Sequence, residues 1–322
     1  MPIVHTLHQV RPMFVFAVLC LALMANPEAI IRAASAEESD VKRTEDVIYG
    51  RKFGTALTMD VFQPAKPNGA AVIFCVSGGW FSAHESINTG FGAELLKRGY
   101  TVFAVVHGSQ PKFTITEVLQ DMHRAVRYIR AHAKDYGIDP NRIGISGASA
   151  GGHLSLMQGT AGTPGDADAK DPIDRESSRV QAVGCYFPPT DFLNYGQPGE
   201  NAMGRGVLKD LRAPFDFEEF DKETKHFVPI TDEARLVAIG KEISPVTHVT
   251  ADDPPTLIIH GDADKLVPIQ QAQSIIEKLN AASVPTKLVV KEGKAHGWDN
   301  LTADMTVIAD WFDKYLAAPA AK

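Results

Sequence analysis

The sequence predicts an α/β fold with a mostly parallel central sheet and helices on both faces. Residues 70–76 form a continuous apolar run of the kind seen in strands buried on both sides, and residues 100–106 are predicted to form another buried strand. Between the predicted strands lie segments with apolar residues at helical spacing, the longest of which covers residues 115–136 and ends at Gly137. This alternation predicts parallel pairing, because neighbouring parallel strands need a long crossover that is usually a helix.

Other segments extend this pattern in chain order. Residues 44–50 and 56–62 alternate apolar and polar side chains, which predicts a hairpin with one exposed face. Residues 188–244 interrupt the alternation, and we predict that they form an insertion over the carboxyl edge of the sheet, a plain surface insertion being the alternative. We predict that residues 37–322 form a single domain. Its remaining elements are expected to be strands at residues 180–187, 255–260 and 286–290 and helices at residues 91–98, 269–280 and 301–315.

The composition excludes several classes of protein. A chain of 322 residues with 44% hydrophobic and 22% charged residues is typical of a globular protein. Its net charge of −7, without a cluster of Lys or Arg, argues against a nucleic-acid partner. Cys75 and Cys185 lie inside apolar runs, so we expect them to be small buried side chains. The chain has no Cys/His spacing that suits a metal.

The first 36 residues have the layout of a secretory signal peptide. Residues 13–25 are apolar and uncharged, Arg11 precedes them, and Ala34-Ser35-Ala36 provides a small-x-small cleavage site. The apolar run is shorter than the roughly 20 residues that span a bilayer. We therefore expect an exported protein, periplasmic or secreted, with no stable membrane insertion after residues 1–36 are removed. An uncleaved membrane anchor is the alternative.

The segment on which the functional prediction rests is Gly147-Ala148-Ser149-Ala150-Gly151. It matches the G-x-S-x-G pattern of a nucleophile elbow, with an apolar strand before it and a helix after it. The residues two before and two after such a serine must be small, because the backbone turns sharply there. The helix that follows directs its first amides and its positive dipole end toward developing negative charge. Ser149 is the candidate nucleophile.

A general base and an acid are expected in loops that follow later strands, because ligands of such sheets bind at the carboxyl ends of strands. His296 follows the strand 286–290 in a loop of small residues and is the candidate base. Asp262 and Asp264 both follow the strand 255–260, and an acid is needed to orient the imidazole. Spacing alone leaves both aspartates open.

Glycines after the strand 70–76 offer a site for an oxyanion. Bare backbone amides are needed there, so the candidate donors are Gly78, Gly79 and the amide of Ala150 beside the nucleophile. His260 lies near the two aspartates, but no second His/Asp cluster completes a metal coordination set. We expect neither a metal nor another cofactor.

Together these motifs resemble the α/β-hydrolase superfamily, and within it the feruloyl-esterase-like (BD-FAE) group, from about Thr44 to the C-terminus. Residues 147–152 correspond to the group's G-x-S-A-G-G elbow, which implies Ser149 as nucleophile. Residues 260–268 are similar to its H-G-x-x-D-x-x-V-P segment, in which the fifth residue is the acid, so the resemblance implies Asp264. His296 lies in the matching histidine loop, and the chain order Ser, Asp, His is that of the superfamily.

One segment departs from the group's pattern, which usually has H-G-G-G before a tryptophan. Aligned on Trp80, Val76 stands in place of the histidine and Ser77 in place of the first glycine. Aligned on Ser77, the frame shifts by one residue. Gly79 is an oxyanion donor in both alignments and Gly78 in only one, so the departure concerns the oxyanion geometry and not the triad.

The expected function is therefore that of a serine carboxylic-ester hydrolase. The resemblance implies short-acyl or aryl esters as substrates, either small molecules or acetyl and feruloyl groups on polysaccharides. Two alternatives remain: a serine peptidase of the prolyl-oligopeptidase type, and a non-catalytic binding protein on a hydrolase fold.

Overall fold

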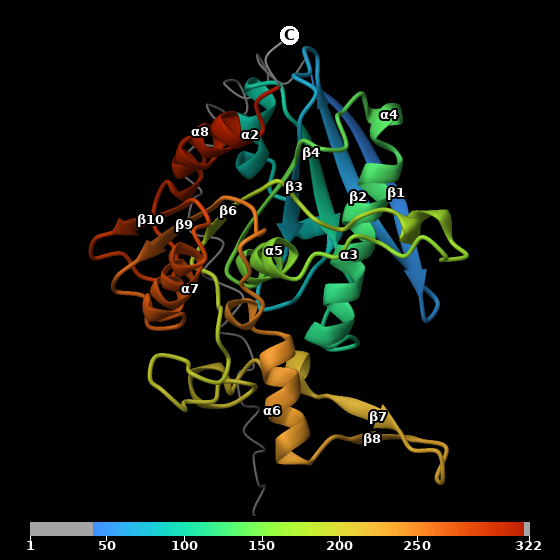
Figure 1. Ribbon diagram of the computed structural model, residues 1–322, viewed down its shortest axis with the longest axis vertical. Coiled ribbons are helices and arrows are strands. Elements are labelled where there is room, and N and C mark those ends of the chain that lie inside the picture. Colours follow the sequence, from blue (N-terminus) through green and yellow to red (C-terminus); the bar gives the residue numbers. More distant parts are fainter. Residues whose placement is uncertain (1–40, 319–322) are drawn as a thin grey trace, which may run out of the picture. The chain divides into compact units, whose positions relative to one another are not determined.

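The computed structural model describes residues 41–318, and the predicted signal peptide, residues 1–36, lies outside the described residues. Within them an eight-stranded sheet has the order β1-β2-β4-β3-β5-β6-β9-β10 (Figure 1). The strands are β1 (Val41–Lys52), β2 (Thr55–Pro64), β3 (Ala71–Val76), β4 (Thr101–Val106), β5 (Ile143–Ala148), β6 (Ala182–Tyr186), β9 (Thr256–Gly261) and β10 (Thr286–Lys291).

The sheet is parallel except at one edge. β1 and β2 form the predicted antiparallel hairpin, and β2 pairs antiparallel with β4. Every pair from β4 through β3, β5, β6 and β9 to β10 is parallel. The mostly parallel sheet predicted from the alternation of strands and helices is thus confirmed.

Helices cover both faces of the sheet, as predicted. α3 (Ile115–Ala131), α5 (Ala150–Thr160) and α7 (Gln270–Ala281) pack on one face, and α2 (Gly90–Lys97) and α8 (Met305–Tyr315) pack on the other. The sequence of β3 is apolar without alternation because both of its faces are buried. Ile73 and Cys75 belong to one hydrophobic core, and Val72 and Phe74 belong to the other. Cys75 and Cys185 are both buried, and neither forms a disulfide.

The long helix predicted for residues 115–136 is wrong in one respect, because it is interrupted at His132. α3 ends at Ala131, and a single turn, α4 (Ala133–Tyr136), follows. His132 has a non-helical backbone; its ring stacks on Tyr128, and its Nδ1 donates to the Tyr128 carbonyl oxygen. A local side-chain contact of this kind competes with the continuing helix, which the apolar spacing does not reveal.

The insertion lies at the carboxyl edge of the sheet, as predicted. It contains a small hairpin, β7 (Glu218–Phe220) and β8 (Phe227–Pro229), and a helix, α6 (Glu233–Glu242), which Figure 1 shows beyond one end of the central strands. Its Tyr195 hydroxyl donates to the carbonyl oxygen of Leu266, in the loop after β9. Within residues 41–318, no helix is both long and apolar enough to span a bilayer.

Candidate active site

Ser149 occupies a strained turn between β5 and α5. Its backbone has φ 55° and ψ −117°, a conformation that L-residues rarely adopt. A Cβ at Gly147 would lie 2.5 Å from backbone atoms of Gly151, so only glycine fits at that position. The amide of Ser149 donates to the carbonyl oxygen of Tyr186, at the end of the neighbouring β6. These contacts hold the serine at the carboxyl edge of the sheet.

His296 lies between Ser149 and Asp264. Its Nδ1 is 2.7 Å from Oδ2 of Asp264, and its Nε2 is 2.9 Å from Oγ of Ser149. A carboxylate only accepts hydrogen bonds, so Nδ1 carries the proton and Nε2 is free to accept from the serine hydroxyl. The three side chains singled out in the sequence therefore form one continuous hydrogen-bonded chain.

Asp264 is held as an ionised carboxylate. Its Oδ1 accepts hydrogen bonds from the amides of Leu266 and Val267, both at 2.9 Å. Burial by itself would raise the pKa of Asp264, but hydrogen bonds from His260, His296 and the Val267 amide outweigh burial and lower that pKa well below its ordinary value. A negative charge therefore faces the Nδ1 side of His296 at any physiological pH.

The rival aspartate, Asp262, points elsewhere. Its Oδ1 accepts a hydrogen bond of 2.6 Å from the amide of Gly293, in the turn before the histidine loop. Nε2 of His260 is hydrogen-bonded to the carbonyl oxygen of Val267 at 2.8 Å. The alternatives that spacing left open are thus separated by position, because only Asp264 contacts His296.

The predicted oxyanion donors are not equivalent. Gly78 and Phe81 exchange two backbone hydrogen bonds, so the Gly78 amide is already bonded to the Phe81 carbonyl oxygen at 3.0 Å. The prediction of Gly78 as a donor is therefore wrong, since an amide has a single hydrogen to donate. Within residues 41–318, the amides of Gly79 and Ala150 have no hydrogen-bond partner, so both remain available for a ligand.

Two histidines that the sequence analysis did not single out contact this glycine segment. Nε2 of His107 is 2.8 Å from Oγ of Ser77, and Nδ1 of His153 is 3.2 Å from Nε1 of Trp80. A sequence signal existed for the first pair: Ser77 and His107 directly follow strands that run in parallel, so they reach the same edge. His153 lies within a helix, where spacing does not reveal which neighbour its ring faces.

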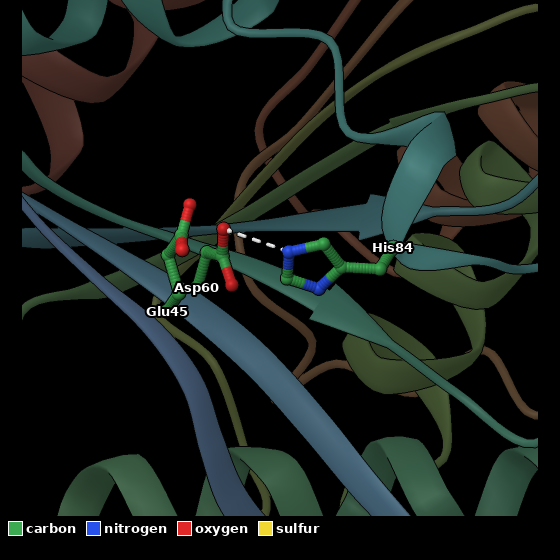
Figure 2. A group of neighbouring side chains, drawn as sticks. All are labelled: Glu45, Asp60 and His84. Carbon is green, nitrogen blue, oxygen red and sulfur yellow. Dashed lines mark ion pairs between the residues drawn. The ribbon is translucent and has the colours of Figure 1, made fainter.

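A separate charged cluster, Glu45, Asp60 and His84, has the composition of a metal site. Figure 2 shows the His84 ring directed at Asp60, with 3.5 Å between Nε2 and Oδ2. However, the guanidinium of Arg43 contacts Asp60 at 2.5 Å and Glu45 at 3.2 Å. A guanidinium stays protonated, so this cation already contacts both carboxylates and balances one of their two charges, and we assign no metal to the cluster.

A serine on a strand–helix elbow, with its acid and its histidine in loops after later strands of a mostly parallel sheet, defines an α/β-hydrolase. Comparison with known proteins agrees with this class and narrows it. The chain belongs to the BD-FAE family, whose model matches residues 59–279. The fold and the family predicted from the sequence motifs are confirmed.

The relatives carry esterase names. The probable carboxylic ester hydrolase LipM of Mycobacterium tuberculosis is 29% identical over 76% of this chain and 53% of its own length. The chain thus spans about half to six tenths of the length of such curated relatives. Two solved structures are each 26% identical: a truncated carbohydrate esterase from gut microbiota (88% of this chain, 99% of that chain, TM-score 0.69) and an esterase from Thermogutta terrifontis (89%, 96%, TM-score 0.65).

Proposed function

We propose that this protein is a serine carboxylic-ester hydrolase that acts through Ser149, His296 and Asp264. The observation that carries the proposal is the hydrogen-bonded chain from Asp264 through His296 to Ser149, at 2.7 and 2.9 Å. It ends at a strained serine beside two unpaired amides, those of Gly79 and Ala150. A nucleophile, a base, an orienting acid and oxyanion donors are the parts that acyl transfer requires.

The proposed reaction proceeds in two stages. Ser149 Oγ attacks the ester carbonyl while Nε2 of His296 takes the hydroxyl proton, and Asp264 stabilises the imidazolium that forms. The amides of Gly79 and Ala150 donate to the oxyanion of the tetrahedral intermediate. Collapse breaks the bond to the alcohol, which leaves with the proton from His296. Water then attacks the acyl-enzyme with His296 again as the base, and the acid product and Ser149 are released.

We propose short-acyl or aryl esters as substrates, including acetyl or feruloyl groups on polysaccharides. The name of the gut-microbiota carbohydrate esterase supports the carbohydrate part of this proposal. The insertion supports the size limit: a Cβ on Gly79 would lie 3.1 Å from Cδ2 of Leu211, so the Leu211 side chain contacts the oxyanion segment. A bulky apolar side chain beside this segment restricts the space for a long acyl chain.

We also propose that the protein is exported after removal of residues 1–36. The apolar run at residues 13–25 and Ala34-Ser35-Ala36 support this proposal. Intact-mass analysis of the protein that the full-length gene delivers outside the cytoplasm tests it. A mass that corresponds to a start at Glu37 is expected, and a full-length mass in the membrane fraction would contradict it.

Hydrolysis of p-nitrophenyl acetate, butyrate and octanoate by residues 37–322, beside the Ser149→Ala variant, tests the catalytic proposal. We expect turnover that falls with chain length and is lost in the variant. A fluorophosphonate probe should label the wild type and not the variant. Labelling without ester turnover, but with cleavage after proline in peptide p-nitroanilides, would favour the peptidase. Neither labelling nor turnover would favour the non-catalytic binding protein.

A further inference from the structure

The four residues Ser77-Gly78-Gly79-Trp80, called here the oxyanion loop, form an unusually strained turn. Gly79 and Trp80 both have positive φ, 55° and 59°, and the amide of Phe81 donates to the Gly78 carbonyl oxygen across them. Two successive residues of this kind occur in type I′ turns, which favour Gly and Asn. A tryptophan in this conformation is an outlier, so neighbouring contacts must hold it there.

Trp80 is held through its indole. The ring is buried, with only 2% of its surface exposed, and packs against Phe192 and Phe215 of the insertion at ring-centroid distances of 5.8 and 5.3 Å. Its Nε1–H donates to Nδ1 of His153. An indole nitrogen only donates, so Nδ1 of His153 carries no proton and Nε2 donates to the Ile243 carbonyl oxygen at 2.7 Å.

Ser77, at the other end of the loop, is held in a corresponding way. Nδ1 of His107 is 2.7 Å from the carbonyl oxygen of Gly108, which only accepts, so Nδ1 carries the proton. In the neutral ring Nε2 is then an acceptor, and the Ser77 hydroxyl donates to it at 2.8 Å. The Gly108 amide in turn donates to the buried carboxylate of Asp121, which fixes the segment behind the loop to α3.

Both histidines are neutral at the pH of most assays. Burial lowers the pKa of His107 to about 4, and burial likewise lowers the pKa of His153 to about 4. Each therefore keeps one bare nitrogen, which is the acceptor that the oxyanion loop needs. Protonation would place an N–H of His153 against the indole N–H of Trp80.

We propose that His107 and His153 are positioning residues that hold the oxyanion loop from its two ends and so aim the Gly79 amide at the developing oxyanion. This inference rests on the proposed hydrolase function and goes beyond it. The pair replaces the histidine that the H-G-G-G pattern would supply and that this chain lacks at Val76 and Ser77. Because His153 also bonds to Ile243, the loop position is tied to the insertion as well.

The test compares variants that keep or lose one hydrogen bond at a nearly constant volume. His153→Asn retains an acceptor near the Nδ1 position for Trp80, whereas His153→Gln retains a donor near the Nε2 position for Ile243 and loses that acceptor. Ser77→Thr keeps the hydroxyl and Ser77→Ala removes it. His123→Leu is the matched control, because His123 is also a buried histidine and contacts Ser178 and Gln158 away from the loop.

The readouts are kcat and KM on p-nitrophenyl acetate and the inhibition constant of a trifluoromethyl ketone, which forms an oxyanion with Ser149. We expect Ser77→Ala and His153→Gln to lower kcat by about 10- to 100-fold with KM unchanged. The reason is that displacing a catalytic group by about 1 Å lowers the rate about 100-fold. Affinity for the ketone should fall by the same factor. Ser77→Thr and His153→Asn should recover most of both.

The proposal is overturned if folded Ser77→Ala and His153→Gln keep the wild-type kcat. It is also overturned if His123→Leu loses as much activity, or if kcat of His153→Asn is no higher than that of His153→Gln. Ser149→Ala, assayed in parallel, keeps this outcome separate from failure of the hydrolase function. If the wild type does not turn over the ester, the rate of fluorophosphonate labelling replaces kcat, because that reaction needs Ser149 and the oxyanion loop but no particular substrate. A loop that is not held by the histidines would then label at equal rates in all variants.

Discussion

Replacing Gly261 by alanine should displace His296, the proposed general base, without contacting its side chain. Gly261 is the last residue of β9, and its Cα faces the backbone of the loop that carries His296. A Cβ at this position would lie 2.2 Å from the carbonyl oxygen of Lys294 and 2.8 Å from that of Ala295. Real Cβ atoms essentially never approach closer than 3.0 Å, so the two backbones must separate by at least 3.0 − 2.2 = 0.8 Å.

A shift of this size is comparable to the tolerance of the triad. His296 follows Lys294 by two residues, and its bonds to Asp264 and Ser149 are 2.7 and 2.9 Å long. If either bond lengthened by the full 0.8 Å, its donor–acceptor distance would lie beyond the normal range of a hydrogen bond. A misplacement of about 1 Å costs about 100-fold in rate, so we expect kcat/KM to fall by about 100-fold, or about 2.7 kcal/mol of transition-state stabilisation.

The assay is kcat/KM on p-nitrophenyl acetate, normalised to the folded fraction from circular dichroism. Two other glycines separate the geometric effect from instability. Gly144→Ala creates a clash with Phe312 and Leu316 in the core, at 2.9 Å, and should lose stability but keep its activity per folded molecule. Gly92→Ala, within α2, meets only ordinary contacts at 3.7 Å and should keep both its fold and its activity per folded molecule. Wild-type activity per folded molecule in Gly261→Ala would contradict the expected displacement of His296.

Three further predictions concern the acid, the insertion and pH. Asp264→Asn should lower kcat by about 10³- to 10⁴-fold and Asp262→Asn should leave it unchanged, since only Asp264 fixes the His296 tautomer; equal losses in steady-state assays would contradict this. Leu211→Ala should raise kcat/KM for the octanoate ester relative to the acetate by about tenfold, because it removes the side chain beside Gly79; an unchanged ratio would argue against it. In urea unfolding, the free energy of unfolding should be constant above about pH 6.5 and should fall between about pH 6.5 and pH 4. The loss should be roughly 3 kcal/mol for each buried histidine, because in that range the histidine binds a proton in the unfolded chain and not in the folded one. The histidines with folded pKa values of about 4 are His107, His123 and His153. His123→Gln should remove the contribution of one histidine to the pH dependence of the free energy of unfolding. An unchanged pH profile in this variant would contradict the lowered pKa of His123.

The parts of the fold that could be predicted are those that local sequence determines. The apolar run at residues 70–76 predicts a strand buried on both faces, and β3 has one hydrophobic core on each side. The rule that ligands gather at the carboxyl ends of parallel strands placed His296 and the two aspartates in the correct loops. The residue types and their positions directly after predicted strands were sufficient to find these residues, because the sheet brings those strand ends together.

What could not be predicted depends on which atoms meet across the fold. Asp262 and Asp264 are two residues apart in one loop, and only the turn around them decides which carboxylate reaches His296. The amide of Gly78 is occupied because the chain turns back at Phe81, a contact that composition does not reveal. The break of the long helix at His132 has a similar cause, a single side-chain bond to Tyr128.

Three of the histidines around the site, His107, His153 and His296, also differ in a property that only the structure shows, namely the group that faces the second ring nitrogen. For His296 that group is the carboxylate of Asp264, which stabilises a positive imidazole. For His107 and His153 it is a neutral backbone carbonyl oxygen, that of Gly108 and of Ile243 respectively. Of these three rings, only His296 has an anion to balance a proton gained from Ser149. Histidine is therefore suited to the proposed role of a base at position 296 and of a fixed acceptor at positions 107 and 153, and the difference lies in the partner of the second ring nitrogen.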